Sequence, residues 1–410
     1  MRKPRAILVP YPAQGHVIPM MELMQRLVKY GVKVTFVNTN FTHKLVTDAF
    51  SEDEKLNDLA SLVSLPDGLE TGEDRNDFVG EKMKIRKAAF WPAAAITLAS
   101  LFCIPKLLED GIIDNKGTPL KKKMVQLSPT MPGISSLEFT WLGIGDLKTQ
   151  ETLFNLMVKA SEFVTLADFT ICNSTYELEK GTFTSYPEIL PVGPLLASNR
   201  VANQIGHFWK EDSTCLAWLD QQPARSVIYV AFGSFTLFDL TQFDELAHGL
   251  EMTNMPFLWV VRSDMVKDMK NDGYNDRIKS RGRIVGWAPQ QKVLNHPSVG
   301  CFVSHCGWNS VLEGVSSGLP FMCWPYFSDQ FANRMYISDV WKTGLVFDKD
   351  KSGIVSREEI KNKIEQLLGN DEFKVRAIDL KEKVAVAVSK GGHSDKNFGN
   401  FIDWIQEKDT

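Results

Sequence analysis

The sequence predicts two doubly wound α/β domains that face each other across a cleft. Its 410 residues are more than one ordinary domain needs, and strand-like and helical patterns alternate through both halves. A proline-bearing turn, Pro191–Pro194, and a polar run, 198–204, separate the halves and indicate a linker. We therefore predict an N-terminal domain at 1–195, a linker at 196–215, a C-terminal domain at 216–390 and a terminal segment at 391–410.

The composition is that of a globular protein and argues against several partners. Hydrophobic residues make up 44% of the chain, and a net charge of −4 leaves no basic footprint for nucleic acid. Pro10 and Pro12 interrupt the apolar start, so we expect no signal peptide, and no apolar run reaches the roughly 18 residues of a membrane span. Six cysteines without CxxC pairs favour a reducing compartment, although buried cysteines would look the same. We expect a cytoplasmic protein.

The N-terminal half opens with a βαβ pattern that presents a histidine. Residues 6–9 form an apolar strand, 11–16 a turn, 17–30 an amphipathic helix and 32–37 a second strand. His16 therefore lies at the carboxyl end of the first strand, where open α/β sheets bind ligands. Taken alone it is equally a solvated loop histidine. A nicotinamide site is disfavoured because the turn lacks GxGxxG and the second strand ends in Asn38 rather than an acidic residue.

Further elements follow in order along both halves. The N-terminal half continues with helices at 91–108 and 153–167, a strand at 169–173 and a short helix after Asn173. The apolar helix at 91–108 is either core or a wall of an acceptor pocket, with core favoured, and Trp141 and Phe154 either line an acceptor site or pack in the interior. The C-terminal half has strands at 226–232, 257–261 and 345–347, and helices at 238–253, 332–343, 357–368, 373–389 and 394–405. Ser234 ends the first of these strands and is either a phosphate contact or a simple turn residue.

The stretch from Trp287 to Gln330 carries the chemistry. A buried strand at 299–303 leads through a glycine-containing turn into a helix opening at Asn309 and Ser310, so free N–H groups point outward. This is an anion site, and His305 flanks it. Glu313 follows one turn later, where a carboxylate can accept from a ribose diol. Asp329 and Gln330 follow a neighbouring strand, and Trp287 offers a ring face for a base; together these groups predict a nucleotide-sugar site.

Each of these residues has an ordinary structural interpretation as well. His305 with Cys301 and Cys306 lacks standard zinc spacing, so we expect no metal site. The tryptophans are each compatible with a core position, and Glu313 alone is compatible with a helix-surface charge. Their occurrence together and in order favours the functional interpretation.

Four motifs follow one another here: W-A-P-Q at 287–290, H-C-G-W-N-S at 305–310, E-G at 313–314 and D-Q at 329–330. With them the chain resembles the plant secondary-product glycosyltransferases, the family 1 enzymes that use UDP-sugars, and especially their 83A-like subfamily. The resemblance extends to both ends of the chain. It implies the two-domain glycosyltransferase B fold, with the sugar donor on the C-terminal domain, the acceptor on the N-terminal domain, and 394–405 crossing back onto the latter.

The resemblance also implies roles for individual residues. His16, in P-A-Q-G-H, would be the general base that deprotonates the acceptor hydroxyl. On the donor side, Trp287 would stack on uracil and Ala288 would contact the edge of the base through its backbone, while Gln290 would lie near the ribose and Glu313 would accept hydrogen bonds from the ribose hydroxyls. The diphosphate would be bound by His305, Asn309 and Ser310, with Ser234 as a further phosphate contact. The sugar hydroxyls would be held by Trp308, Asp329 and Gln330.

The implied reaction is inverting transfer of a sugar to a hydroxyl of a small lipophilic acceptor such as a flavonoid, phenolic or terpenoid. The glutamine that ends the motif favours UDP-glucose over related UDP-sugars. We expect a monomer that needs neither metal nor cofactor.

One part of the chain departs from the family pattern. After Leu65–Gly68 the family has a helix and a strand whose aspartate orients the base histidine, whereas here the polar segment Glu70–Gly80 runs directly into 81–90. About one βα unit, some 30 residues, is absent. Asp67, Asp74 and Asp77 lie nearby but match no motif. The alternative function is therefore a catalytically impaired UDP-sugar-binding isoform.

Overall fold

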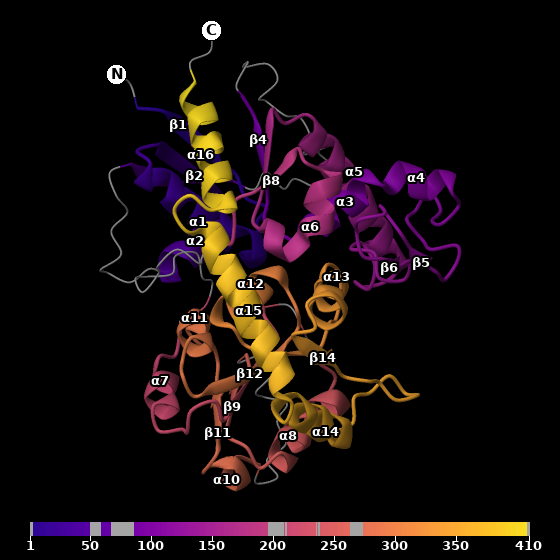
Figure 1. Cartoon of the computed structure of the whole chain (residues 1–410), viewed down its shortest axis with the longest axis vertical. Helices are drawn as coiled ribbons and strands as arrows, with labels where there is room; N and C mark the ends of the chain where they lie inside the picture. Colours follow the sequence, from indigo (N-terminus) through magenta and orange to yellow (C-terminus); the bar gives the residue numbers. More distant parts are fainter. Residues whose placement is uncertain are drawn as a thin grey trace.

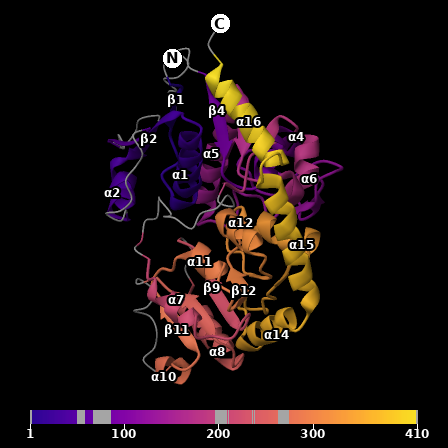
Figure 2. The ribbon, with the colours of Figure 1, turned by 60° about the vertical axis from the view of Figure 1, so that its left-hand side comes forward.

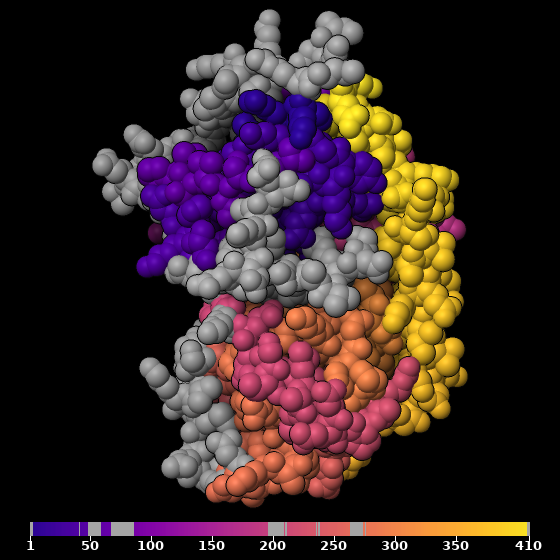
Figure 3. All heavy atoms as spheres, turned by 90° about the vertical axis from the view of Figure 1, so that its left-hand side faces the viewer, coloured from indigo at the N-terminus to yellow at the C-terminus, as the bar shows by residue number. Residues whose placement is uncertain are grey.

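The computed structural model describes residues 3–49, 59–66, 86–195, 209, 211–234, 236, 238–262 and 274–407. Two α/β halves lie one above the other, and a long pair of C-terminal helices runs along both (Figures 1 and 2). The space-filling view shows the same two lobes with the C-terminal helices along one side (Figure 3). No helix in these ranges is both long and apolar enough to cross a membrane.

The C-terminal half is built on one parallel sheet of six strands in the order β11-β10-β9-β12-β13-β14. Its strands are β9 (Val227–Ala231), β10 (Phe257–Val260), β11 (Gly282–Val285), β12 (Val299–Ser304), β13 (Phe321–Cys323) and β14 (Gly344–Val346). Every residue of β9 is buried, as its unbroken apolar run predicts for a central parallel strand. The helices are α7 (Thr214–Leu219), α8 (Leu240–Met252), α10 (Tyr274–Ile278), α11 (Gln290–Leu294), α12 (Trp308–Ser317), α13 (Gln330–Met335) and α14 (Arg357–Leu368). The predicted doubly wound fold is confirmed for this half.

The N-terminal half contains two separate parallel sheets of three strands among the described residues, in the orders β1-β2-β3 and β4-β7-β8. The strands are β1 (Arg5–Leu8), β2 (Lys33–Thr39), β3 (Ala60–Leu65), β4 (Ala88–Trp91), β7 (Phe169–Cys172) and β8 (Ile189–Pro191), with a small antiparallel pair β5 (Met124–Val125) and β6 (Ile134–Ser135). The helices are α1 (Gln14–Lys29), α2 (Asn40–Ala49), α3 (Ala95–Phe102), α4 (Ile104–Glu109), α5 (Leu147–Thr165) and α6 (Tyr176–Ser185).

The division between the two sheets lies where the predicted βα unit is absent. β1 pairs with β2 alone and β4 with β7 alone in the described part of the chain, so each ends its sheet. Ile7 of β1 is 64% exposed, which is unusual for an apolar residue of a parallel sheet, and Val9 just after the strand is 67% exposed. The shortened segment, including Asp67, Asp74 and Asp77, lies outside the described residues.

Several predicted boundaries were wrong, among them the start of α5, which begins at Leu147 rather than at 153. α1 begins at Gln14 rather than after His16, because Ala13 is extended (φ −128°, ψ 145°) and serves as the N-cap. The helix predicted at 91–108 is instead the end of β4 followed by α3 and α4. Pro105, which has no N–H, lies in the first turn of α4, and α3 has already ended at Phe102. The helix predicted at 332–343 divides into α13 and a short π-helix, η2 (Tyr336–Val340).

Most of the predicted linker at 196–215 lies outside the described residues, so the domain boundaries stay a prediction. The last two helices, α15 (Asp371–Val388) and α16 (His393–Gln406), connect the halves. Phe398, Phe401 and Ile402 of α16 share a core with α1 and β2, and Asn397 donates to the Pro191 carbonyl at 2.9 Å. The terminal segment therefore packs on the N-terminal half.

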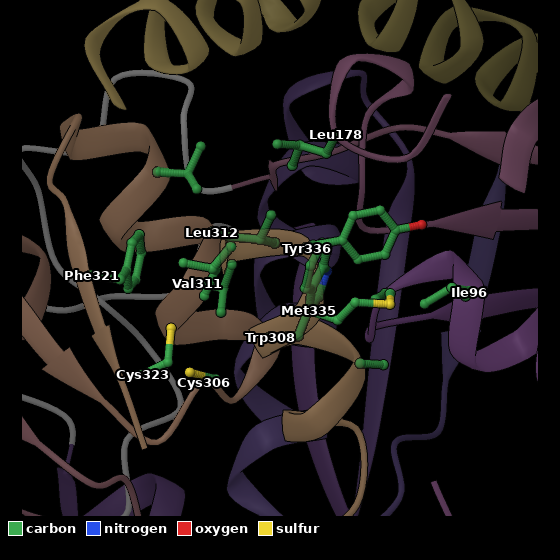
Figure 4. Packing of buried hydrophobic residues seen from close by; sticks show 14 of the residues in the cluster. Ile96, Leu178, Cys306, Trp308, Val311, Leu312, Phe321, Cys323, Met335 and Tyr336 are labelled. Atoms are coloured by element: carbon green, nitrogen blue, oxygen red, sulfur yellow. The ribbon is translucent and has the colours of Figure 1, made fainter. Parts of the chain in front are cut away.

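A buried apolar core joins the two halves beside the cleft. Ile96 of α3 and Leu178 of α6 belong to the same cluster as Trp308, Leu312 and Tyr336 of the C-terminal half (Figure 4). The Trp341 indole also donates to the Leu178 carbonyl at 3.0 Å. Because these contacts are apolar and closely packed, they hold the halves in one relative orientation.

We expect Leu312→Ala, which removes a fully buried side chain from this shared core, to destabilise the protein by about 2–5 kcal/mol. The matched control is Val386→Ala on α15, because Val386 is 68% exposed and its truncation should change stability by no more than about 0.5 kcal/mol. Urea unfolding of the two variants measures the difference. Equal unfolding midpoints would contradict tight packing in this shared core between the two halves, which we call the seam.

Candidate active site

A cavity of about 360 Å³ opens between the two halves, and it is lined by residues of both. All twelve residues predicted from the sequence line it: His16, Ser234, Trp287, Ala288, Gln290, His305, Trp308, Asn309, Ser310, Glu313, Asp329 and Gln330. The structure thus brings the histidine of the N-terminal half and the motif residues of the C-terminal half around one space, although they are far apart in sequence.

His16 lies in the first turn of α1, with its side chain open to the cavity. The ring of Tyr11 meets it edge to face, with centroids 5.2 Å apart. Although the residue is exposed toward the cavity, the surrounding protein partly desolvates its imidazole and lowers the pKa of His16 to about 4, so the ring is neutral at pH 7. No carboxylate of the described chain forms a hydrogen bond with this ring. His16 can therefore accept a proton, and in this part of the structure it has no orienting acid.

The turn between β12 and α12 brings the N-terminus of α12 to the cavity. Cys306 is left-handed (φ 66°), and Gly307 is the N-cap without a side-chain hydrogen bond. The His305 ring is held between two glycines: a Cβ atom on Gly233 or Gly307 would lie 2.7 or 2.4 Å from its Nε2. Burial lowers the pKa of His305 to about 4. The helix N-terminus beside this ring favours an anion.

Glu313 forms the centre of a polar group on α11 and α12. Its carboxylate accepts from Gln290 Nε2 at 2.5 Å and from Gln291 Nε2 at 3.2 Å, and Gln290 also donates to Ser310 Oγ at 2.9 Å. The Tyr229 hydroxyl donates to Gln290 Oε1 at 3.0 Å. Burial raises the pKa of Glu313 to about 7 despite these donors. The carboxylate is thus fixed in place and has capacity for further donors.

Asp329 and Gln330 are held at the exit of β13. Asp329 accepts from Asn333 Nδ2 at 2.8 Å, and burial raises its pKa to about 6. Gln330 Oε1 accepts from the backbone N–H groups of Tyr326 and Phe327 at 2.7 and 3.1 Å. The amide nitrogen of Gln330 is left as the group that can face a ligand.

Two tryptophans of the site differ in their surroundings. One face of Trp287 stacks on Trp209, with centroids 4.8 Å apart and planes at 27°, which leaves its other face for a ligand. Trp308 is 3% exposed, and its indole donates to the Asn173 carbonyl at 2.8 Å. The indole N–H of Trp308 is therefore committed to the contact between the halves and is not free for a sugar hydroxyl.

Asn309 also makes an unexpected contact across the cavity. Its Nδ2 donates to the Gly15 carbonyl at 3.0 Å, next to His16. The sequence predicted both residues for the site but not this bond between them, because no local pattern relates positions so far apart in the chain.

Several lining residues were not predicted. Thr236 is 3% exposed, and its Oγ1 lines the cavity without a hydrogen-bond partner in the described chain. The sequence could have predicted Thr236 as a lining residue, because it lies two positions after Ser234 in the turn that follows β9. Trp91, Pro92 and Ala93 line the side near His16. They begin the segment 91–108, for which a core position was favoured over a pocket wall.

Trp141 and Phe154 were considered for either an acceptor wall or packing, and the structure shows packing. Trp141 is fully buried, its indole donates to the Gly117 carbonyl at 2.8 Å, and its ring meets Phe154 with centroids 5.3 Å apart. Among the described residues no group of three or more metal-ligating side chains is arranged to hold an ion.

The fold and the site together define a class of protein. Residues 159–383 match the family described as "UDP-glucoronosyl and UDP-glucosyl transferase", and the chain belongs to this family. It is a UDP-glycosyltransferase of plant family 1, of the 83A-like kind, with the glycosyltransferase B fold.

Two curated relatives illustrate the likeness. The chain is 37% identical to "UDP-glycosyltransferase 83A1" of Arabidopsis thaliana, covering 100% of this chain and 98% of the relative. It is 31% identical to "Linamarin synthase 1" of Manihot esculenta, covering 98% and 96%. The first alignment spans 462 residues while the chain has 410, so about 52 positions of the relative have no counterpart here, in agreement with an absent βα unit.

Solved structures agree on the fold. A UDP-glucosyltransferase from Polygonum tinctorium capable of glucosylating indoxyl, in complex with 3,4-dichloroaniline, superposes with a TM-score of 0.84 at 26% identity, covering 99% of each chain. UGT2 of Phytolacca americana, complexed with UDP-2-fluoro-glucose and pterostilbene, gives 0.82 at 25% identity, covering 98% of this chain and 100% of that one.

Because the pKa of Glu313 is raised, we expect the stability of the protein to depend on pH. Glu313→Gln should make this pH dependence weaker, since glutamine does not ionise. Between the ordinary carboxyl pKa of 4.5 and about 7, the folded protein keeps a proton that the unfolded chain releases. The free energy of unfolding should therefore fall as pH rises through this window. Across the window, a pKa shift of this size lowers the free energy of unfolding by about 3 kcal/mol. Below the window Glu313 is protonated in both the folded and the unfolded states, so its ionisation does not change the stability there.

Urea unfolding of the wild type and of Glu313→Gln, repeated from about pH 4 to about pH 8, measures how the free energy of unfolding of each protein depends on pH. The difference between the two proteins isolates Glu313, because Glu179 and Asp329 are buried carboxyls with raised pKa values in both. Parallel stability curves would contradict a raised pKa for Glu313.

Proposed function

We propose that this enzyme transfers glucose from UDP-glucose to a hydroxyl of a small lipophilic acceptor with inversion at the anomeric carbon. One observation carries the proposal: a single cavity joins a neutral histidine on one half to an open helix N-terminus and fixed polar groups on the other. We further propose that the enzyme acts as a cytoplasmic monomer without a metal.

The donor would lie along α12. The free face of Trp287 would stack on uracil, with the Ala288 backbone at its edge. The hydrogen bonds from Gln290 and Gln291 hold the Glu313 carboxylate where ribose hydroxyls can donate to it. The diphosphate would contact His305, Asn309, Ser310 and the first N–H groups of α12, with Ser234 and Thr236 opposite.

The sugar would lie between Asp329 and Gln330, where a carboxylate accepts from sugar hydroxyls and the free amide nitrogen of Gln330 donates to them. As the bond from the anomeric carbon to the diphosphate breaks, negative charge develops on the leaving oxygen. The helix dipole and fixed donors stabilise this charge without reorganisation. Trp308 would support this region through its position in the seam rather than through its indole N–H.

The acceptor would enter on the side of His16. Trp91, Pro92, Ala93 and Met157 make this wall largely apolar, which suits a lipophilic ring system. The wall is rigid because the Trp91 indole donates to Thr97 Oγ1 at 2.9 Å. His16 Nε2 or Nδ1 would take the acceptor proton while the oxygen attacks the face of the anomeric carbon opposite UDP. The printed names of relatives that act on small molecules support this acceptor class.

A catalytically impaired isoform is the second candidate. It is favoured by the split of the N-terminal sheet and by the lack of a carboxylate bonded to His16 within the described ranges. Such a protein would bind the donor but transfer sugar slowly. Turnover, not nucleotide binding, distinguishes the two functions.

We expect His16→Ala to lower kcat by about 10²–10⁴-fold while leaving UDP affinity unchanged, because a general base contributes about this much and His16 lies outside the donor half. The pKa of about 4 predicts that the wild-type rate keeps its base down to acidic pH, since His16 loses its basic form only near that value. UDP release with UDP-glucose and a panel of phenols and terpenoid alcohols measures both.

Transfer by the wild type at a rate equal to that of His16→Ala would instead identify the impaired isoform. A wild-type acid limb near the ordinary histidine pKa of 6.5 would contradict a desolvated base.

UDP should raise the thermal midpoint of the wild type, because a ligand at about 100 times its Kd stabilises the folded state by about 2.7 kcal/mol. Glu313→Ala should weaken UDP binding by about ten- to hundredfold, the effect of losing a charge-assisted hydrogen bond. Calorimetry measures the affinity. Glu382→Ala on α15, outside the cavity lining, is the control and should bind UDP as the wild type does. Unchanged affinity in Glu313→Ala would remove the ribose contact from the proposal.

A further inference from the structure

Pro19 lies inside α1, where proline is unusual. An N–H at this position would donate to the carbonyl four residues earlier, that of Gly15, and proline has no N–H. The pyrrolidine ring also crowds that carbonyl. The backbone of α1 therefore leaves the Gly15 oxygen without its normal helical partner, immediately before His16.

The missing partner is supplied by the other half of the protein. Asn309 Nδ2 donates to Gly15 O at 3.0 Å, from the first turn of α12. An asparagine amide has two N–H groups and a carbonyl oxygen, so this bond uses one N–H and leaves the other groups facing the cavity. The contact thus joins the turn that carries His16 to the N-terminus that would bind the diphosphate.

We propose that Pro19 is a positioning residue: by freeing the Gly15 carbonyl, it orients the Asn309 amide for the diphosphate and aligns His16 with the donor. This inference rests on the proposed function of both sites. Pro19 is itself buried and is absent from the described residues that line the cavity. Any effect of Pro19 on the ligand therefore passes through Gly15 and Asn309.

Pro19→Ala tests the link because it adds the N–H that draws the Gly15 carbonyl back into the helix. We expect it to weaken UDP binding about tenfold by calorimetry and to lower kcat at saturating UDP-glucose about tenfold, since small misplacements of reacting groups cost this much or more. Lys29→Ala, at the exposed end of the same helix, is the control and should change neither value by more than about twofold.

A double-mutant cycle separates positioning from a general effect on the fold. In an Asn309→Ala background, which already lacks the amide, Pro19→Ala should cause no further loss of UDP affinity. If the loss is the same in both backgrounds, or if Pro19→Ala binds UDP within about twofold of the wild type, the inference is overturned. Should Pro19→Ala fail to fold by circular dichroism, Pro19→Gly restores the same N–H and must show the same pattern.

The proposed function and the role of Pro19 are tested by different measurements: sugar transfer by the wild type tests the first, and the UDP titrations of the variants test the second. A wild type that binds UDP but transfers no sugar contradicts the proposed transfer, yet the UDP titrations of the cycle still decide the role of Pro19. A wild type that transfers sugar with an unaltered Pro19→Ala variant leaves the proposed function intact and removes the inference.

Discussion

The relative position of the two halves is the constraint on which the site depends. Each half carries only part of the chemistry, so a base and a donor site are useful only if the seam holds them at one distance. Trp308 contributes twice to this seam, with its ring in the shared core and its indole N–H on the Asn173 carbonyl. The neighbouring Ser174 donates to Glu179 at 2.6 Å, and Glu179 in turn accepts from the backbone N–H groups of Ala95 and Ile96 at the start of α3. The same small network therefore connects the donor motif to the helix that follows the acceptor wall.

The divided N-terminal sheet leaves the architecture of the fold intact. The two sheets of three strands still share a core, because Phe90 and Phe169 pack with residues of α1 and β2. The glycosyltransferase B fold survives because α16 and the seam add contacts that do not involve the absent unit. β1 lacks a neighbouring strand on one side in the described chain, and its Ile7 is exposed, as is Val9 just after it. The fold therefore does not depend on the absent unit.

Much of the fold and site could be predicted from the sequence because the information was local. The anion site depends on a strand, a turn and a helix adjacent in the chain, and the buried run of β9 has one reasonable structure. Predictions were wrong where a long-range partner decides: Ala88–Trp91 is a strand because β7 pairs with it, not because of its own pattern. The committed indole of Trp308, the stacking of Trp209 on Trp287, and the bond from Asn309 to Gly15 likewise depend on residues far away in sequence.

The charges around the cavity indicate how such a site can be prepared for its ligands. Burial shifts four groups toward their neutral forms, with a pKa of about 7 for Glu313, about 6 for Asp329 and about 4 for both His16 and His305. Hydrogen bonds donated to a carboxylate favour its ionised form, so ribose and sugar hydroxyls would lower the pKa values of Glu313 and Asp329. Ligand binding would then release protons from the donor side. The two histidines would remain neutral, with His305 beside the diphosphate and His16 able to accept a proton. A cavity that desolvates its acids and its base together thus keeps the base active and reserves carboxylate charge for the bound state.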